Sequence, residues 1–155
     1  LVFLGGVSVD VDGKDVVPSE IHGYRGIMFE NVPNLASTFG YTNASWTLKA
    51  DLTADFVTRL LKYMDRHDYA EARPVPDGEI GDAPWLDFSS GYVQRALEHL
   101  PKQGDKLPWR LHQNYMKDIF LIRHANLEDG VLCFRKRPAT EQASPRKASA
   151  PLAAE

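Results

Sequence analysis

One long amphipathic segment constrains the fold of this chain more than any other feature. From Ser45 to about Arg66, apolar residues recur at steps of three and four. The apolar stripe comprises Leu48, Leu52, Phe56, Leu60 and Met64, with Val57 and Leu61 beside it. This spacing predicts an α-helix that packs one face on a sheet. The intervening charged residues are expected to face water: Lys49, Asp51, Asp55, Arg59, Lys62 and Asp65.

Shorter segments before and after the helix predict strands and further helices. Valines alternate with polar residues over 7–11 and are followed by Asp12-Gly13, which predicts a β-hairpin. The apolar runs 27–29, 35–39 and 131–134 are predicted strands. The proline-containing stretch 69–91 predicts an irregular surface segment. Helices are expected over 92–100, ending at Pro101, and over about 110–124, with Leu111, Tyr115, Ile119 and Ile122 facing the core.

Together these elements predict an α/β fold over residues 1–134 and a disordered tail over 135–155. The tail contains Pro138, Pro145 and Pro151 and almost no large apolar side chain. The basic run 135–137 is therefore expected to be a solvated charge cluster. The chain opens at Leu1 with an apolar run and without the basic segment of a signal peptide, so we expect it to continue a larger protein.

Composition excludes several classes of function. The chain has 155 residues, 43% hydrophobic and 25% charged, and its net charge of -3 gives no basic field for nucleic acid. It has no apolar run of the roughly 18 residues that a membrane span requires. The single cysteine, Cys133, lies in an apolar run and is expected to be a buried thiol. A lone cysteine is compatible with a reducing, cytoplasmic location.

No complete catalytic constellation is present in the sequence. The histidines show none of the HxH, HxxxH or HExxH spacings, and no cysteine cluster accompanies them, so we expect no metal site. There is no GxSxG nucleophile motif and no glycine-rich phosphate-binding loop. We therefore assign no catalytic residue.

The junction before the long helix is the strongest candidate for a binding site. The predicted strand 35–39 ends at Gly40, and a four-residue loop leads directly into the helix. Such strand-to-helix turns bind ligands in α/β proteins, and a helix amino end favours anionic or electron-rich groups. Thr42, Asn43 and Ser45 are candidate helix caps with short polar side chains, and Gly40 allows a ligand to approach the backbone. The alternative is an ordinary capped helix with no ligand.

The same junction carries a resemblance to a known family. The run GYTNASWTLKADLT (40–53), preceded by NVPNLASTF (31–39), resembles the late part of class B flavin-containing monooxygenases, in the Baeyer-Villiger branch related to the ethionamide-activating enzymes. Four further runs look like the same family in the same order: LGGVSVDVDGK (4–14), YRGIMFENVPN (24–34), FVTRLLKYMD (56–65) and PWRLHQNYMKDIFLIR (108–123). The resemblance extends to about Phe134.

This resemblance implies the carboxy-terminal part of a split, Rossmann-like FAD-binding domain, incomplete on its own. Both GxGxxG motifs, for FAD and NADPH, would lie in a missing amino-terminal portion. The implied reaction uses NADPH and O2 to form a peroxyflavin, which oxidises a ketone or a sulfur compound. The implied flavin contacts are Thr42, Asn43, Ala44 and Ser45, and Trp46 is either a substrate-lining residue or simple packing. The class's catalytic arginine cannot be placed on Arg25, Arg59, Arg110 or Arg123.

Two other interpretations remain open at the level of sequence. The chain could be a stand-alone α/β binding or interaction module whose helix start holds an anion or a peptide. It could also belong to a flavin disulfide reductase, whose CxxxxC pair would lie upstream. On the main interpretation, the isolated chain is expected to be inactive and to bind flavin weakly.

Overall fold

The longest element of the computed structural model, which describes residues 3–42, 44–85 and 99–138, is the helix α1 (Trp46–His67). It begins after Ser45, whose Oγ accepts a hydrogen bond from the Thr47 amide at 3.4 Å. It ends at Asp68, which caps the helix in the left-handed conformation (φ 55°). The predicted helix is therefore confirmed, with its apolar stripe buried from Leu52 onwards.

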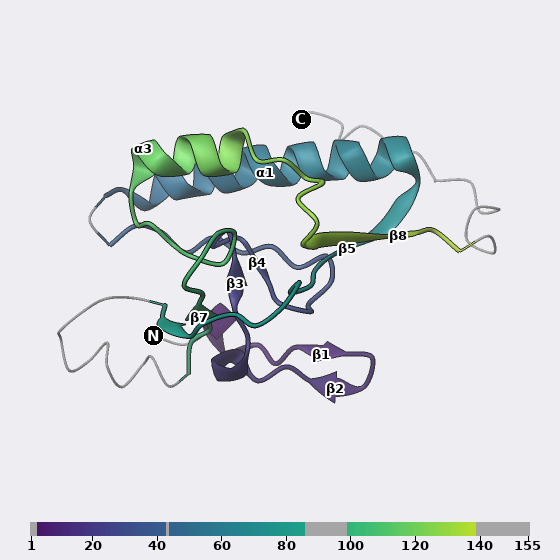
Figure 1. The fold of residues 1–155 in the computed structure, drawn as a ribbon, viewed down its shortest axis with the longest axis horizontal. Coiled ribbons are helices and arrows are strands. Elements are labelled where there is room, and N and C mark those ends of the chain that lie inside the picture. Colours follow the sequence, from purple (N-terminus) through teal and green to yellow (C-terminus); the bar gives the residue numbers. More distant parts are fainter. Residues whose placement is uncertain (1–2, 43, 86–98, 139–155) are drawn as a thin grey trace, which may run out of the picture.

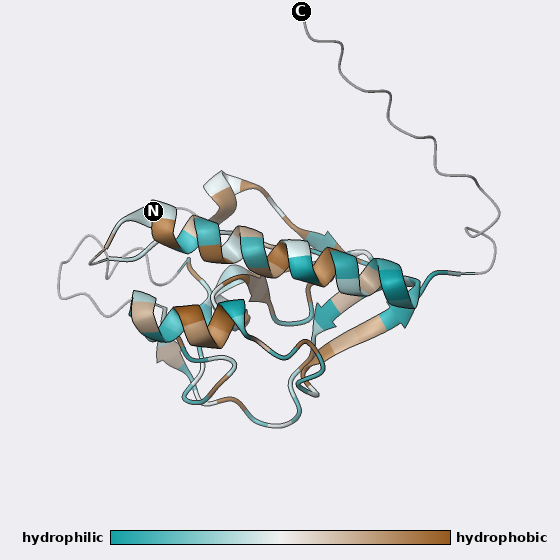
Figure 2. Ribbon diagram, turned by 90° about the horizontal axis from the view of Figure 1, so that it is seen from above, coloured by the Kyte–Doolittle hydropathy of each residue, from teal (hydrophilic) through white to brown (hydrophobic). Residues whose placement is uncertain are grey.

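A shorter helix lies beside α1. It consists of α3 (Tyr115–Asp118), which continues into one π-helical turn, η3 (Ile119–Arg123). Figures 1 and 2 show the two helices side by side, forming a layer over the strands. The prediction of a helix over 110–124 is correct only from Tyr115. The helix starts late because Gln103 accepts the Leu111 amide at 2.8 Å and Asn114 caps the Lys117 amide at 3.1 Å.

The strands beneath this layer are short and pair antiparallel in two-stranded units. The pairs are β1 (Asp10–Val11) with β2 (Lys14–Asp15), β3 (Gly23–Tyr24) with β4 (Met28–Phe29), β5 (Tyr69–Pro74) with β8 (Leu132–Lys136), and β6 (Ala83–Pro84) with β7 (Lys102–Gln103). The short 3-10 helices η1 (Phe3–Gly6) and η2 (Pro18–Glu20) flank the first pair. The predicted first hairpin is confirmed. The mixed content is consistent with an α/β fold, but the described residues contain no parallel Rossmann sheet.

Three expectations about strands and tail are wrong. Residues 35–39 run extended without joining a strand pair; within them, the Ser37 amide donates to Ile27 O at 2.8 Å. Residues 69–74 are not irregular but form β5, because β8 supplies a distant partner strand. Arg135 and Lys136 belong to β8 rather than to a tail. The predicted helix over 92–100 and the tail beyond residue 138 fall on or extend into residues outside the described part.

Alternation along β8 also overturns the expectation for the cysteine. Leu132 is buried and Phe134 is half-buried, while Cys133 between them is exposed. Successive side chains of a strand point to opposite faces, so the apolar run does not bury all its members. Cys133 is thus a surface thiol.

The core consists of two apolar clusters. The larger lies under the helical layer and includes Phe56, Ile122, Trp109 and Leu132. The smaller is built from Phe29, Val32, Trp85 and Leu100, with partly buried residues such as Phe39 packed against it. At the amino end of α1, Trp46 packs on Phe39, which itself packs against the smaller cluster. Among the described helices, none is long and apolar enough to cross a membrane.

Candidate functional site

At the junction predicted from sequence, the described residues of the turn are exposed and the two residues before it are buried. Thr42, Ala44 and Ser45 are exposed, whereas Gly40 and Tyr41 before them are buried. Asn43 lies outside the described residues. The structure thus brings the described members of the predicted site together at the amino end of α1. The side chains of Thr42, Ala44 and Ser45 are short.

Close packing of Gly40 against Trp46 fixes the shape of this turn. A Cβ atom on Gly40 would lie 2.2 Å from Cγ of Trp46, which no side chain can tolerate. The Trp46 ring also packs on Phe39, with the ring centroids 5.4 Å apart. Only glycine therefore allows the indole to fold back over the chain, although Trp46 remains 55% exposed.

A buried polar cluster lies beneath the turn. Asp118 of α3 accepts hydrogen bonds at Oδ2 from the Tyr41 hydroxyl (2.8 Å) and from Lys49 Nζ (3.0 Å). Burial lowers the pKa of Lys49, although Asp118 opposes this shift. Burial, and then the hydrogen bond to Asp118, raises the pKa of Tyr41. The cluster therefore holds one compensated charge pair and a neutral phenol.

The prediction that Lys49 faces water is wrong. Lys49 precedes Leu52 by three residues and so lies on the buried stripe, with its side chain 6% exposed. Asp118 occupies the matching position on the second helix, between Tyr115 and Ile122. Two opposite charges on apolar stripes were a signal that could have found this pair.

A second contact ties the turn to the segment before α3. The Thr42 amide donates to Oε1 of Gln113 at 3.2 Å. This N–H is therefore already bonded within the protein. No spacing pattern in the sequence singles out Gln113, which falls inside the helix predicted over about 110–124.

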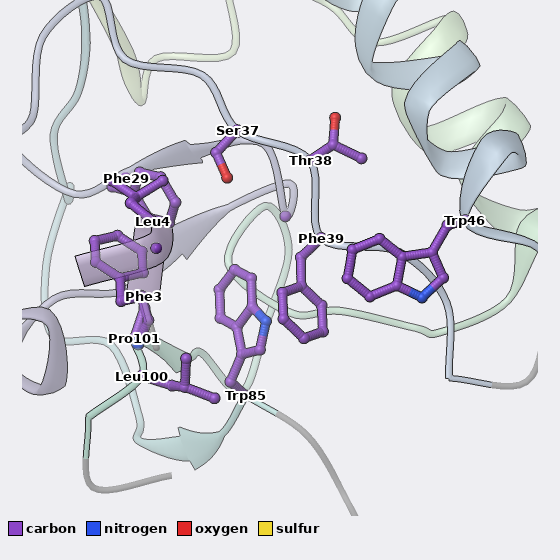
Figure 3. A pocket seen from close by; sticks show the side chains of 12 residues that line it. Phe3, Leu4, Phe29, Ser37, Thr38, Phe39, Trp46, Trp85, Leu100 and Pro101 are labelled. Carbon is purple, nitrogen blue, oxygen red and sulfur yellow. The ribbon is translucent and has the colours of Figure 1, made fainter. Parts of the chain in front are cut away.

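An apolar cavity of about 310 Å³ opens beside the turn (Figure 3). Aromatic rings form much of its wall: Phe3, Phe29, Phe39, Trp46 and Trp85. Among the described residues that line the cavity, Ser37 and Thr38 carry the polar side chains and none is charged. The cavity can accept an uncharged, apolar group next to the start of α1. Trp46, predicted to line a substrate site, is part of this wall.

Comparison with curated proteins identifies close relatives of this chain. The FAD-containing monooxygenase EthA of Mycobacterium tuberculosis (strain H37Rv) is 47% identical over 140 residues, 90% of this chain and 29% of EthA. This chain is homologous to a segment of FAD-containing monooxygenases. The FAD-binding monooxygenase AlmA of Acinetobacter baylyi is 41% identical over 142 residues, 89% of this chain and 28% of AlmA. The FAD-containing monooxygenase MymA of M. tuberculosis is 41% identical over 134 residues, 85% of this chain and 27% of MymA.

The family resemblance inferred from the sequence is thereby confirmed. The monooxygenase segment spans less than a third of the length of these relatives. No family model matches the chain, and no solved structure matches it. The relatives favour the enzyme-segment interpretation over a stand-alone binding module.

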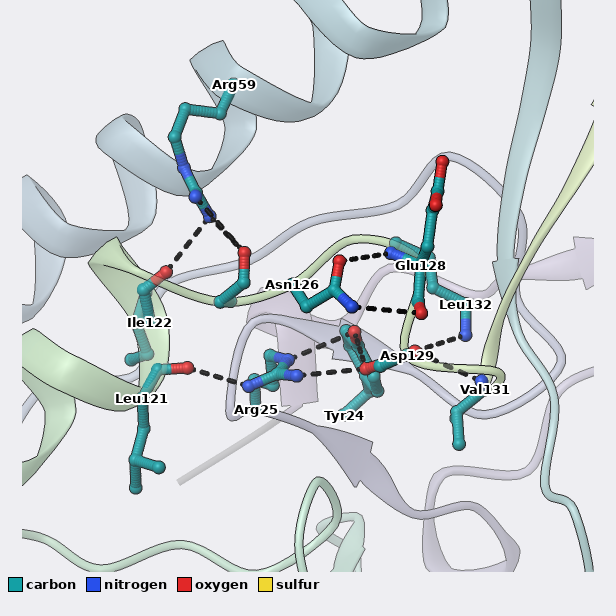
Figure 4. A network of polar contacts seen from close by, with 11 residues as sticks. Tyr24, Arg25, Arg59, Leu121, Ile122, Asn126, Glu128, Asp129, Val131 and Leu132 are labelled. Atoms are coloured by element: carbon teal, nitrogen blue, oxygen red, sulfur yellow. Dashed lines mark hydrogen bonds and ion pairs between the residues drawn. The ribbon is translucent and has the colours of Figure 1, made fainter.

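Arg25 and Arg59 of the monooxygenase segment are engaged in structural contacts (Figure 4). Arg25 donates to Asp129 Oδ2 at 2.9 Å and to Leu121 O at 2.7 Å. Arg59 donates to the carbonyls of Ile122 and Ala125, each at 3.2 Å. Both guanidinium groups thus satisfy carbonyl groups at the end of η3. Arg123 binds Asp51 and Asp55 on α1, which ties the two helices together.

The polar contacts of His22 also connect parts of the fold. His22 is buried, with Nδ1 2.6 Å from Glu30 and Nε2 2.8 Å from Asp82. These contacts join the segment before β3 to the loop before β6. Across the described residues, no group of three or more histidine, cysteine or acidic side chains is arranged to hold a metal ion.

Proposed function

We propose that this chain is the closing part of the FAD domain of an NADPH-dependent monooxygenase, with the turn 42–45 facing the isoalloxazine ring. The observation that carries the proposal is the 47% identity to EthA over 90% of the chain. The FAD domain would include residues up to Lys136, because β8 extends that far. The split Rossmann arrangement and the use of NADPH are parts of this proposal.

The residues of the turn fit such a cofactor. The 22-residue helix α1 presents its amino end there, with its positive dipole end and its first N–H groups. Short, exposed residues at 42, 44 and 45 permit a flat ring to approach the backbone. The neighbouring apolar cavity supplies a dry wall on one side of the turn.

When bound and reduced, the flavin supplies the activation of O2 and the transfer of one oxygen atom to the substrate. The chain's own contribution is electrostatic and steric. Amide groups at the start of α1 stabilise negative charge that develops on the reduced ring. Phe39, Trp46 and Trp85 exclude water and hold the apolar part of the substrate. A ketone or a sulfur compound fits a cavity whose described lining residues carry no charge.

The decisive experiment removes one amide without changing the backbone shape. Ser45 has φ of -62°, which proline also adopts, so Ser45→Pro deletes an N–H in place. Ser45→Ala is the matched control, because it loses the capping hydroxyl but keeps the amide. In the full-length enzyme, we expect Ser45→Pro to lower the flavin reduction potential more than Ser45→Ala does. Equal potentials in parent, Ser45→Pro and Ser45→Ala would overturn the flavin-facing assignment.

A further inference from the structure

Resting on the flavin-facing role proposed above, we infer that Tyr41, Lys49 and Asp118 form a positioning cluster that sets the reduction potential of the bound flavin. These residues do not touch the cofactor. They hold the turn 42–45 in place against α3, and this fixes the backbone amides of the turn in front of the ring.

Two residues of the cluster flank the turn in the sequence. Tyr41 immediately precedes it, and Lys49 follows it within the first turns of α1. Both side chains converge on a single oxygen, Oδ2 of Asp118, at 2.8 Å and 3.0 Å. Movement of the turn away from α3 would therefore break both contacts together.

Because the three residues of the cluster are buried, their contacts restrict how α1 and α3 can be oriented. Tyr41 is 3% exposed, Lys49 5% and Asp118 7%, so no bulk water is at hand to replace a lost partner. The Lys49 ammonium lies 5.7 Å from the centre of the Tyr41 ring, and the Tyr115 ring packs edge-on against Tyr41. A buried ion pair of this kind is weak support for stability but restricts the orientation of the elements that it joins.

A contact outside the cluster reinforces the same alignment. Gln113, which leads into α3, accepts the Thr42 amide at 3.2 Å. The turn is thus held by the cluster at its base and by Gln113 at its exposed side. Both contacts come from the short stretch 113–118, at the start and end of which Gln113 and Asp118 lie, so the position of this stretch is the reference for the amides of residues 44–46.

The test compares two tyrosines, one near each end of α1, whose hydroxyl groups each donate to a carboxylate. Tyr41→Phe removes the bond to Asp118 and leaves the Lys49–Asp118 pair intact. Tyr63→Phe is the matched control, because it removes a bond to Glu128 near the other end of α1. Both variants are made in the full-length enzyme, and flavin content and reduction potential are measured.

We expect Tyr41→Phe to retain FAD but to bind the reduced form about tenfold less tightly relative to the oxidised form. For a two-electron couple this lowers the potential by about 30 mV. Tyr63→Phe should keep the parent potential. A second variant, Lys49→Met with Asp118→Asn, removes both charges, leaves an acceptor for Tyr41 and should lower the potential in the same direction. It decides the question if Tyr41→Phe does not fold.

Parent potentials in both Tyr41→Phe and the double variant would overturn the inference. The result for Ser45→Pro separates this failure from failure of the proposed function. A shifted potential in Ser45→Pro, with parent potentials in both Tyr41→Phe and the double variant, removes the positioning role alone. Parent potentials in Ser45→Pro, Tyr41→Phe and the double variant remove the flavin-facing assignment and the positioning role with it.

Discussion

Asp129 shows how single side chains hold the folded segment together. Its Oδ2 accepts from the Tyr24 hydroxyl (2.7 Å) and from Arg25 (2.9 Å), and its Oδ1 accepts the amides of Val131 and Leu132. Burial alone would raise the pKa of Asp129, but the hydrogen bonds from Tyr24, Leu132 and Arg25 outweigh it and lower this pKa. Because the folded pKa lies below the ordinary value, the ionised form is the one that stabilises the fold.

This carboxylate gives a testable acid dependence. Its contribution is complete above the ordinary pKa of 3.8 and is lost as the pH falls through the lower folded pKa. Asp129→Asn should reduce the free energy of unfolding by about 1–3 kcal/mol at neutral pH and flatten the acid limb of the stability curve. The measurement is thermal unfolding of the full-length protein from about pH 7 to about pH 3. Asp77→Asn, at an exposed position, should match the parent, and an unchanged acid limb in Asp129→Asn would contradict the account.

Among the structural elements, the sequence predicted α1 well because its stripe repeats over many turns. The prediction of a strand over 35–39 was wrong. A short apolar run does not distinguish a paired strand from an unpaired segment, here one whose Phe39 packs on Trp46 and Trp85. β5 was missed because its own residues include a proline and charged side chains. Its register with β8 depends on a partner about sixty residues away, which local patterns cannot report.

The candidate site was predicted in part for the same reasons. Helix start, cap and glycine are local features, so the position of the turn followed from the sequence. Lys49, Asp118 and Gln113 belong to contacts between α1 and the second helical segment. Their pairing depends on how the helices pack side by side, and the periodicity of each helix alone does not specify it.

The close packing at the junction also predicts that one added methyl group at Gly40 lowers stability. Gly40→Ala places a Cβ 2.2 Å from the Trp46 ring, whereas Gly78→Ala meets nothing within 4 Å. We expect Gly40→Ala to cost about 1–3 kcal/mol and to reduce the FAD content of the full-length enzyme. Gly78→Ala should stay within about 0.5 kcal/mol of the parent. Replacing Trp46 by alanine in the Gly40→Ala background should recover stability; a Gly40→Ala enzyme identical to the parent would refute the close-packing argument.

For the whole molecule, the segment carries only part of the proposed flavin site. It covers 29% of EthA, and it exposes large apolar residues at Trp46 (55%), Met116 (64%) and Phe120 (67%). Such surface favours association with other protein. We expect residues 1–155 expressed alone to retain little FAD and to aggregate, as measured by flavin absorbance and light scattering. A monomeric segment that binds FAD tightly would contradict this expectation.

The most direct test of the central claim is a crystal structure of the full-length enzyme with FAD bound. We predict that the isoalloxazine ring lies within about 4 Å of the backbone at residues 42–45, with the start of α1 directed at it. A ring bound elsewhere, with this turn facing solvent or another part of the protein, would contradict the account.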